Sequence, residues 1–407
     1  MESEKLYVEK INILGNDITQ ENVIRDALEV DEGDPFNELL HAKSLNNLKA
    51  KNIFKTVESD VLDGSGLNKK IININVVEKP TGEVMLGAGV GSSGGTIGFS
   101  VSENNFMGRG IKLSTALRVT EDTIRGNFTT TTPNFKYSGK PLTTNIQSDV
   151  VDKMADSGYE AKKTGFSFGT SVEQYDDLFF TPQFSTYFEQ LETDATASAN
   201  LKKQAGNYFE TAFSYNIDYD KRNQKFQTSD GFRSKFTQSI PIVSDDYALL
   251  NGYEFSKYEQ FNDVIGSVSI YTRAVNSFTD EDVRISNRLY LPSKKLRGFE
   301  PGKIGPTDAG DFVGGNYATA VNVVTTLPKL FATVQNAEFQ FFFDAANVWG
   351  VDYSDTIDDS NKIRTSTGVA INWYTPIGPL NFSLAQPITK AKSDKTESFR
   401  FNLGTTF

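Results

Sequence analysis

From residue 80 to its last residue, the sequence repeats short stretches in which apolar and polar residues alternate, and no helical period is sustained. Examples are GIKLSTALRVT, IGSVSIYTRAV, AEFQFFFDAANVW and PLNFSLAQP, with clusters of Gly, Asn, Asp and Ser between them. A period of two residues indicates strands with two different faces. At roughly 20 residues per strand and connection, the region has room for about sixteen strands, within the range of outer-membrane barrels.

The composition fits a wall that is apolar on one face only. The mean hydropathy is -0.39, yet the chain has 31 Phe and 16 Tyr. Alternation lowers the hydrophobicity of any sequence window although one face stays apolar. No run approaches the roughly 18 apolar residues that a membrane-spanning helix needs. The sequence therefore predicts a membrane all-β fold, an antiparallel transmembrane β-barrel of about sixteen strands.

The chain ends within an alternating stretch, SFRFNLGTTF, which places Phe399, Phe401, Leu403 and Phe407 on one side of a strand. A sheet in a membrane must close, because free N–H and C=O groups are costly in hydrocarbon. We therefore expect the last strand to pair with the first. A terminal Phe407 would lie at the membrane interface as an aromatic anchor.

The first stretch of the barrel region is rich in glycine. GAGVGSSGG contains the G-x-G-x-x-G spacing of a dinucleotide loop, but a strand follows where that fingerprint needs a helix. The mechanical interpretation is that Gly87, Gly89 and Gly91 leave one face of the first strand without side chains. The seam, defined here as the border between the first and last barrel strands, should then be the weakest part of the wall.

Residues 1–79 have a different pattern, which predicts a small α+β domain of order βααββ, ahead of a barrel domain over residues 80–407. We expect Thr19 to cap a first helix and Pro35 to open a second, with the domain boundary at KPTG. The apolar face of the second helix would consist of Leu39, Ala42, Leu45 and Leu48. His41 in this helix is expected to be a surface or half-packed side chain, because one imidazole without partners does no chemistry.

Several function classes are excluded by charge and residue content. A net charge of -11 argues against a nucleic-acid partner. The chain has no cysteine, and His41 is its single histidine, which excludes thiol chemistry, disulfides, histidine-based triads and zinc sites with His or Cys ligands. The aspartates of GVDYSDTIDDSN lack the Gly and Glu positions of a calcium loop and are expected in a solvated hairpin loop. We therefore predict no enzyme, no cofactor and no metal site.

One connection, at about residues 291–316, is too long and too rich in Pro and Gly for an ordinary turn: LPSKKLRGFEPGKIGPTDAGDFVGGN. Such connections are functional or disordered. It is either a surface loop or a loop folded into the barrel, with Arg297 held by a carboxylate. Asp344 is a candidate partner, since a desolvated bidentate pair would latch the loop. The alternation around Asp344 does not settle which face it occupies.

Together, several stretches resemble the BamA-type outer-membrane protein assembly factors. They are LRGF followed by IGP and VGGN, FFFDAANVW, TGVAINWYTPIGPLNFSLAQPI, the terminal FRFNLGTTF and YDKRNQKFQTSDGF. FNELLHAKSLNNLKAKNIFKTVESDV resembles the family's periplasmic POTRA domain. The resemblance covers essentially the whole chain. Because members usually carry several POTRA domains behind a signal peptide, we expect a piece that retains the domain nearest the barrel.

The resemblance implies a sixteen-stranded barrel that folds and inserts other barrel proteins without ATP. Arg297, Gly298 and Phe299 correspond to the family's loop motif, with Leu296 in place of its usual valine. Asp344 matches an acidic wall residue, and Asn322 stands where a glutamate is often found. The latch would then rest on one carboxylate.

The function expected from this resemblance is a non-enzymatic insertase that works through the seam. Its partners would be unfolded β-barrel clients, accessory assembly lipoproteins and outer-membrane lipid, in a bacterial outer membrane with the POTRA domain in the periplasm. The alternatives are a polypeptide-secreting pore of the same superfamily and the mitochondrial assembly homologue. A passive solute channel and a soluble all-β binding module are further alternatives.

Overall fold

The computed structural model describes residues 5–279, 281–328, 336–354, 356–357, 362–375 and 378–404. Phe407, predicted in the last strand, and Asp355, Asp358 and Asp359, predicted in a hairpin loop, lie outside these residues. Within them, no helix is both long and apolar enough to cross a membrane.

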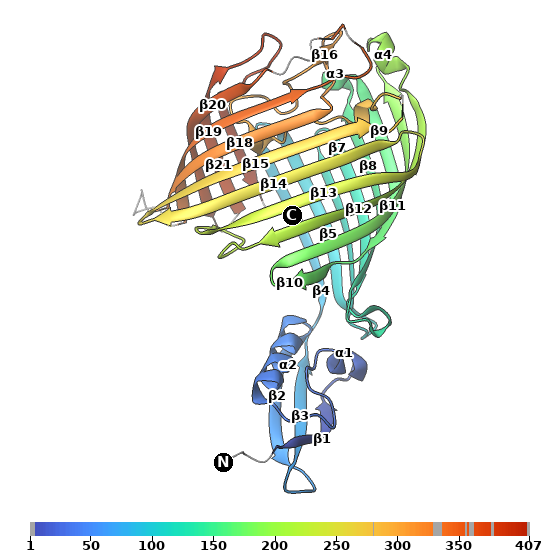
Figure 1. The fold of residues 1–407 in the computed structure, drawn as a ribbon, viewed down its shortest axis with the longest axis vertical. Helices are drawn as coiled ribbons and strands as arrows, with labels where there is room; N and C mark the ends of the chain where they lie inside the picture. The colour runs from blue at the N-terminus through green and yellow to red at the C-terminus, as the bar shows by residue number, and fades with distance from the viewer. Residues whose placement is uncertain are drawn as a thin grey trace. The chain divides into compact units, whose positions relative to one another are not determined.

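The first domain has the predicted order βααββ (Figure 1, blue). Its elements are β1 (Tyr7–Leu14), α1 (Glu21–Arg25), α2 (Glu38–Ala50), β2 (Phe54–Asp63) and β3 (Lys69–Glu78). In the sheet, β3 lies between β1, to which it is parallel, and β2, to which it is antiparallel. Alternate residues of the strands, such as Ile72 and Ile74, pack with Ile24 and Leu48 of the helices. The domain therefore has its own apolar core.

Two helix starts differ from the prediction. Helix α1 begins after Gln20, and the Thr19 hydroxyl instead accepts a hydrogen bond from the Asn105 side chain at 2.9 Å. Helix α2 begins after Asn37, whose side chain accepts from the first free backbone N–H groups, and not at Pro35. The first helix was therefore expected to have a cap that is used elsewhere, and the second has a cap, Asn37, that was not predicted.

The buried face of α2 also differs from the predicted face. Leu39 is 81% exposed, because it lies in the first turn, which extends beyond the core, whereas Leu45 and Leu48 pack against the core as expected. His41, expected to be a surface or half-packed side chain, is buried, and its ring centroid lies 6.0 Å from that of Phe36. Burial lowers the pKa of His41, and the nearby Glu38 carboxylate opposes this shift.

The remaining strands form one closed antiparallel sheet (Figure 1). The first half of its wall consists of β4 (Gly82–Gly91), β5 (Gly94–Phe106), β6 (Ile111–Thr120), β7 (Thr123–Thr132), β8 (Leu142–Lys153), β9 (Tyr159–Gly169), β10 (Val172–Tyr175) and β11 (Leu178–Thr193). The second half consists of β12 (Gly206–Asp220), β13 (Gly231–Ser244), β14 (Ala248–Phe261), β15 (Val264–Ser277), β18 (Tyr317–Leu327), β19 (Ala337–Trp349), β20 (Arg364–Thr375), β21 (Gly378–Thr389) and β22 (Phe399–Gly404).

The sheet has 17 strand segments, but β9 and β10 pair with successive parts of the same neighbour, β11. They therefore form one interrupted strand of the wall, and the barrel has sixteen strands, which confirms the predicted fold class. Short helical turns lie in the connections: η1 (Phe135–Tyr137), α3 (Met154–Ser157), α4 (Ala199–Lys202), η2 (Ile285–Asn287) and η3 (Ser293–Lys295). A small hairpin in the connection between β15 and β18 consists of β16 (Thr307–Asp308) and β17 (Asp311–Phe312).

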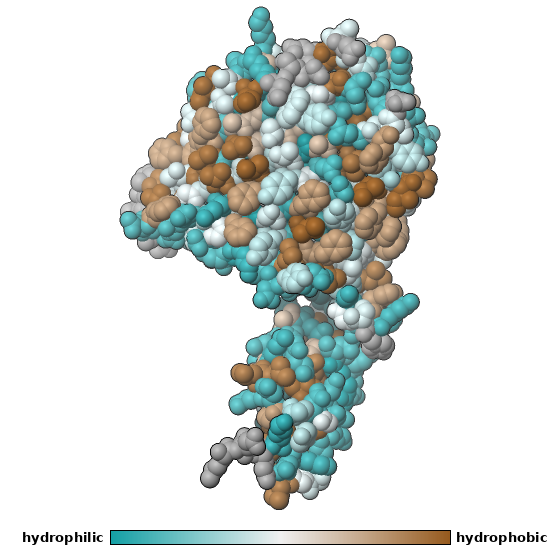
Figure 2. Space-filling model, viewed as in Figure 1, coloured by the Kyte–Doolittle hydropathy of each residue, from teal (hydrophilic) through white to brown (hydrophobic). Residues whose placement is uncertain are grey.

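The two faces of the wall differ as the alternation predicts. On β19, Phe341 and Phe343 are 50% and 43% exposed, whereas Phe342, which lies between them, and Asp344, which follows them, are buried. Apolar side chains accordingly gather over the outside of the barrel (Figure 2, brown). The inward position of Asp344 settles the question that its local pattern left open.

Candidate functional site: the anchored loop and the seam

The long connection between β15 and β18 packs against the inner face of the wall. We call its residues 281–316 the inward loop. Its apolar side chains, including Leu296, Phe299 and Ile304, form one buried cluster with small inward-facing residues such as Ala320 of β18 and Ala346 of β19. Phe299 is only 2% exposed. Small wall residues leave the space that the loop fills, so the loop belongs to the core of the barrel.

Arg297 of the inward loop binds both carboxylate oxygens of Asp344 of β19 through one edge of its guanidinium. Its Nε and Nη2 donate to the two carboxylate oxygens at 2.7 and 2.6 Å, and its backbone N–H donates at 3.0 Å. The Asp344 side chain is fully buried and that of Arg297 is 14% exposed. The guanidinium also lies 3.5 Å from the ring centroid of Phe342, on the same face of β19. Such a desolvated pair depends on both partners.

Asn322 of β18 takes part in the same network. It lies directly opposite Asp344 across the two strands, and its side-chain amide donates to the Asp344 carboxylate at 2.8 Å and to the Lys295 carbonyl at 2.9 Å. At the position where the family often has a glutamate, this chain therefore has the neutral amide of Asn322, which donates a hydrogen bond. The amide orients the Asp344 carboxylate and fixes the loop backbone just before Arg297.

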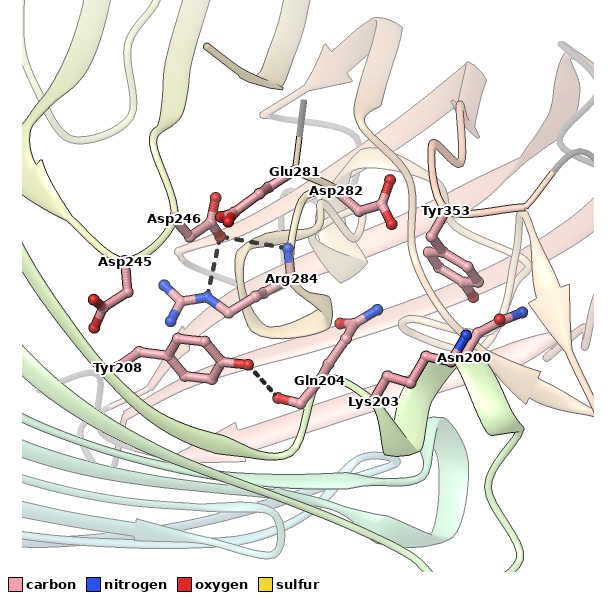
Figure 3. A pocket seen from close by; sticks show the side chains of 10 residues that line it. All are labelled: Asn200, Lys203, Gln204, Tyr208, Asp245, Asp246, Glu281, Asp282, Arg284 and Tyr353. Carbon is pink, nitrogen blue, oxygen red and sulfur yellow. Dashed lines mark hydrogen bonds and ion pairs between the residues drawn. The ribbon is translucent and has the colours of Figure 1, made fainter. Parts of the chain in front are cut away.

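A second anchor, which sequence reasoning missed, is Arg284. It lies with Tyr208 and Asp246 beside a cavity of about 360 Å³ (Figure 3). The Nε of Arg284 donates to Asp246 at 3.0 Å, and its guanidinium lies 3.9 Å from the ring centroid of Tyr208. Both charged side chains are at most 5% exposed. The only signal in the sequence was a basic residue in a long connection, which does not identify a partner.

A third anchor is Arg288, whose side chain is fully buried. It donates to the Asn316 side chain at 2.8 Å and to the Asp352 carboxylate. Asp352, predicted in a solvated hairpin loop, is an exposed residue of the connection between β19 and β20. Its carboxylate also accepts from the Asn316 side chain and from the Val283 backbone at 2.8 and 3.1 Å. These contacts join the inward loop to the connection that follows β19.

The inward loop is also bound to the segment just before the last strand. Glu397 donates its backbone N–H to the Gly298 carbonyl, and Glu300 donates to the Lys395 carbonyl, both at 3.1 Å. Arg400 of β22 donates to the Phe299 carbonyl at 2.9 Å and forms an ion pair with Glu397 at 2.5 Å. The Arg-Gly-Phe segment is therefore attached both to the wall, through Asp344, and to the last strand.

The seam between β22 and β4 is short in the described part of the chain. Asn402, Leu403 and Gly404 pair with Gly91, Val90 and Gly89, whereas β11 pairs with β12 continuously from Leu178 to Leu191. Within the described residues, closure of the sheet therefore depends on a few backbone hydrogen bonds at this border.

Glycine allows the two seam strands to approach closely. A Cβ atom at Gly89 would lie 3.0 Å from the Leu403 carbonyl oxygen, and one at Gly91 would lie 2.7 Å from that of Phe401. Gly87 is on the same inward face of β4 and is buried. On β22, Phe399 is 49% exposed, and its ring stacks with that of Phe401 on the outer face.

Two family models match the chain. The Omp85 superfamily domain matches residues 105–407, and the POTRA model, described as a surface antigen variable number repeat, matches residues 6–79. The first match alone covers well over half of the chain, and the two matches fall on the barrel and on the βααββ domain.

Two curated relatives resemble the chain over nearly its whole length. The outer membrane protein assembly factor BamA of Neorickettsia risticii is 26% identical over 100% of this chain and 56% of the relative. The protein of the same name from Neisseria meningitidis is 23% identical over 99% of this chain and 57% of the relative. The chain thus spans a little over half the length of these relatives.

Solved structures share the fold. BamA of Haemophilus ducreyi lacking POTRA domains 1–3 superposes with a TM-score of 0.89 at 24% identity, covering 99% of this chain and 85% of that chain. CdiB of Acinetobacter baumannii has a TM-score of 0.60 at 11% identity, covering 98% of this chain and 74% of that chain. With the matching family models, these findings show that the chain is an outer-membrane β-barrel with a POTRA domain and belongs to the Omp85 superfamily.

Proposed function

We propose that this chain is the membrane-embedded part of a bacterial outer-membrane protein assembly factor. It folds and inserts β-barrel clients into the outer membrane and makes or breaks no covalent bond. Two assembly factors that bear the name BamA resemble it over almost its full length, which supports this proposal. The clients are unfolded barrel proteins, and accessory assembly lipoproteins cooperate with the POTRA domain on the periplasmic side.

The observation that carries the mechanism is the short seam. A client strand that enters hydrocarbon alone carries unpaired backbone groups, each of which costs several kcal/mol. Separation of β22 from β4 breaks only the hydrogen bonds around Gly89, Val90 and Gly91 in the described part of the seam. The exposed edge of β4 then pairs with the client strand as it enters the membrane, which lowers the barrier to insertion.

In this mechanism the inward loop keeps the wall in shape while the seam opens. Its contacts with β19 through Arg297 and Asp344 are independent of the seam, whereas its contact with Arg400 is on a seam strand. The Arg297–Asp344 pair therefore stays in place on β19, and the contact with Arg400 limits how far β22 moves.

A disulfide across the seam tests the proposal. Val90 and Leu403 are directly opposite each other on the two strands, and the Cα–Cα distance of antiparallel partners lies within the range that a disulfide spans. The chain has no native cysteine that could form a competing disulfide. We expect the oxidised Val90→Cys/Leu403→Cys protein to lose its acceleration of the folding of a urea-unfolded small barrel protein diluted into vesicles. Reduction should restore the acceleration.

The matched control is Ser185→Cys/Ala212→Cys, which cross-links opposite residues of β11 and β12 away from the seam. Full activity of the oxidised seam variant would exclude insertion through the seam. No acceleration by the unmodified chain, combined with large ion conductance, would instead favour the polypeptide-secreting pore.

A further inference from the structure

A chamber of about 800 Å³ lies beside the seam, between the tip of the β4–β5 hairpin, the inward loop and strands β20 to β22. Four cationic side chains line it: Arg118, Lys294, Arg297 and Arg400. No aspartate or glutamate is among its described lining residues. In a chain with a net charge of -11, so positive a lining is a local feature rather than a consequence of composition.

Two of these cations are paired with carboxylates of the described residues. Arg297 is paired with Asp344, and Arg400 is paired with Glu397. Among the described residues, neither Arg118 nor Lys294 has a carboxylate oxygen within 4.0 Å. Both side chains are exposed toward the chamber that they line. The Glu121 carboxylate lies beside Gly94, at the rim, and not against either of them.

Arg118 occupies the inner face of β6, since its neighbours Leu117 and Val119 are exposed on the outer face. An unpaired cation inside a membrane-spanning barrel is costly unless it faces water or a ligand, so such residues mark functional sites. Lys294 approaches the same chamber from the inward loop. Arg118 and Lys294 therefore reach one cavity from two different elements, β6 and the inward loop, which suits an anionic group bound by both.

The chamber also has an apolar side. Phe382 and Phe401 are directly opposite each other on β21 and β22, on the same face as Leu384 and Phe399, which are 56% and 49% exposed on the outside of the wall. Phe382 and Phe401 line the chamber, so its lining joins the cationic interior to the lipid-facing surface at the seam. A ligand that matches this lining has a charged head and an apolar tail.

We propose that the chamber binds an anionic membrane lipid, with its phosphate head group between Arg118 and Lys294 and its acyl chains against Phe382 and Phe401. A peptide segment would not need the lipid-facing aromatic side, and a free anion would not use it. This site does not depend on the assembly activity, because it follows from the lining alone.

The test uses the full chain in detergent and counts bound lipids by native mass spectrometry. The probes are phosphatidylglycerol, which is anionic, phosphatidylcholine of the same acyl chains, which is neutral, and inorganic phosphate. We expect the chain to prefer phosphatidylglycerol, and Arg118→Gln/Lys294→Gln to weaken its binding by about tenfold, as loss of two modest ion pairs implies.

Two further variants keep the test decisive. Arg118→Lys/Lys294→Arg preserves both charges and should keep the preference. Lys235→Gln removes a lysine that shares a face of β13 with Arg233 but does not line the chamber, and should bind as the unmodified chain does. Equal binding of the two lipids, an equal loss in Lys235→Gln, or displacement of the lipid by inorganic phosphate at comparable concentration would each overturn the proposal.

Discussion

Replacement of Asp344 by asparagine should release the Arg-Gly-Phe segment of the inward loop while the barrel wall stays folded. The carboxylate accepts four hydrogen bonds, three from Arg297 and one from Asn322, and it is fully buried. Asparagine has nearly the same shape, but it lacks the negative charge and directs an N–H donor at the donors of Arg297. The guanidinium is then left buried without a counter-charge.

The size of the effect follows from this geometry. Removal of one partner of a buried ion pair costs about 3–5 kcal/mol, and the 14% exposure of the Arg297 side chain places the cost near the lower end, at about 3 kcal/mol. That corresponds to an increase of about two orders of magnitude in the undocked population of the segment. The anchors at Arg284 and Arg288 are separate pairs and hold the start of the loop.

Hydrogen exchange of the vesicle-embedded protein measures this population. The reporting amides are those of Glu300 and Glu397, which donate across the contact between the loop and the segment before β22. Amides in the β11–β12 pair serve as an internal reference for the wall. The matched control is Asp218→Asn, because its partner Arg233 is 33% exposed and that pair should be worth less than about 1 kcal/mol.

A double-mutant cycle decides whether the pair itself is responsible. Arg297→Gln/Asp344→Asn leaves no buried lone charge, so its amides should exchange no faster than those of the Asp344→Asn single variant. If the two substitutions had strictly additive effects, or if Asp344→Asn alone changed the free energy of undocking by less than about 1 kcal/mol, the bidentate pair would not be what holds the segment.

Three further predictions concern other parts of the molecule. Arg400→Gln should weaken the contact of the loop with the last strand by about 1 kcal/mol, because a charged donor to the Phe299 carbonyl is lost, and exchange of the Glu397 amide should report it. Gly91→Val should disrupt the seam, since its Cβ would lie 2.7 Å from the Phe401 carbonyl oxygen, and the barrel should then lose its heat-modifiable gel mobility at a lower temperature. Gly95→Val, whose Cβ has open space around it, should leave that temperature unchanged. Because burial lowers the pKa of His41, the unfolded POTRA domain takes up a proton at a higher pH than the folded domain does, and the free energy of unfolding should fall as the pH falls below about 6.5. Hydrogen exchange of the α2 amides should show this pH dependence, and His41→Gln should reduce it.

The sequence predicted the parts of the fold that depend on local periodicity. Alternation through FQFFFDAANVW identifies a strand, and the membrane requires a sheet of such strands to close, so the barrel and the pairing of its last strand with its first could be predicted. The change to a helical period before KPTG separated the βααββ domain. The starts of α1 and α2 were misplaced because Thr19 and Asn37 find their partners through tertiary contacts and local geometry that spacing alone does not distinguish.

The tertiary structure decided which side chains meet. Arg297 and Asp344 were paired as a hypothesis, but the partners of Arg284, Arg288 and Arg400 had no signal in the sequence, because they are brought together by barrel closure and by the path of one loop. A period of two residues fixes only that neighbouring side chains point to opposite faces. Which face becomes the interior, and which charges are desolvated there, depends on register between distant strands. The sequence therefore determined a closed amphipathic wall, and only the folded chain determined the anchored loop, the short seam and the cationic chamber beside it.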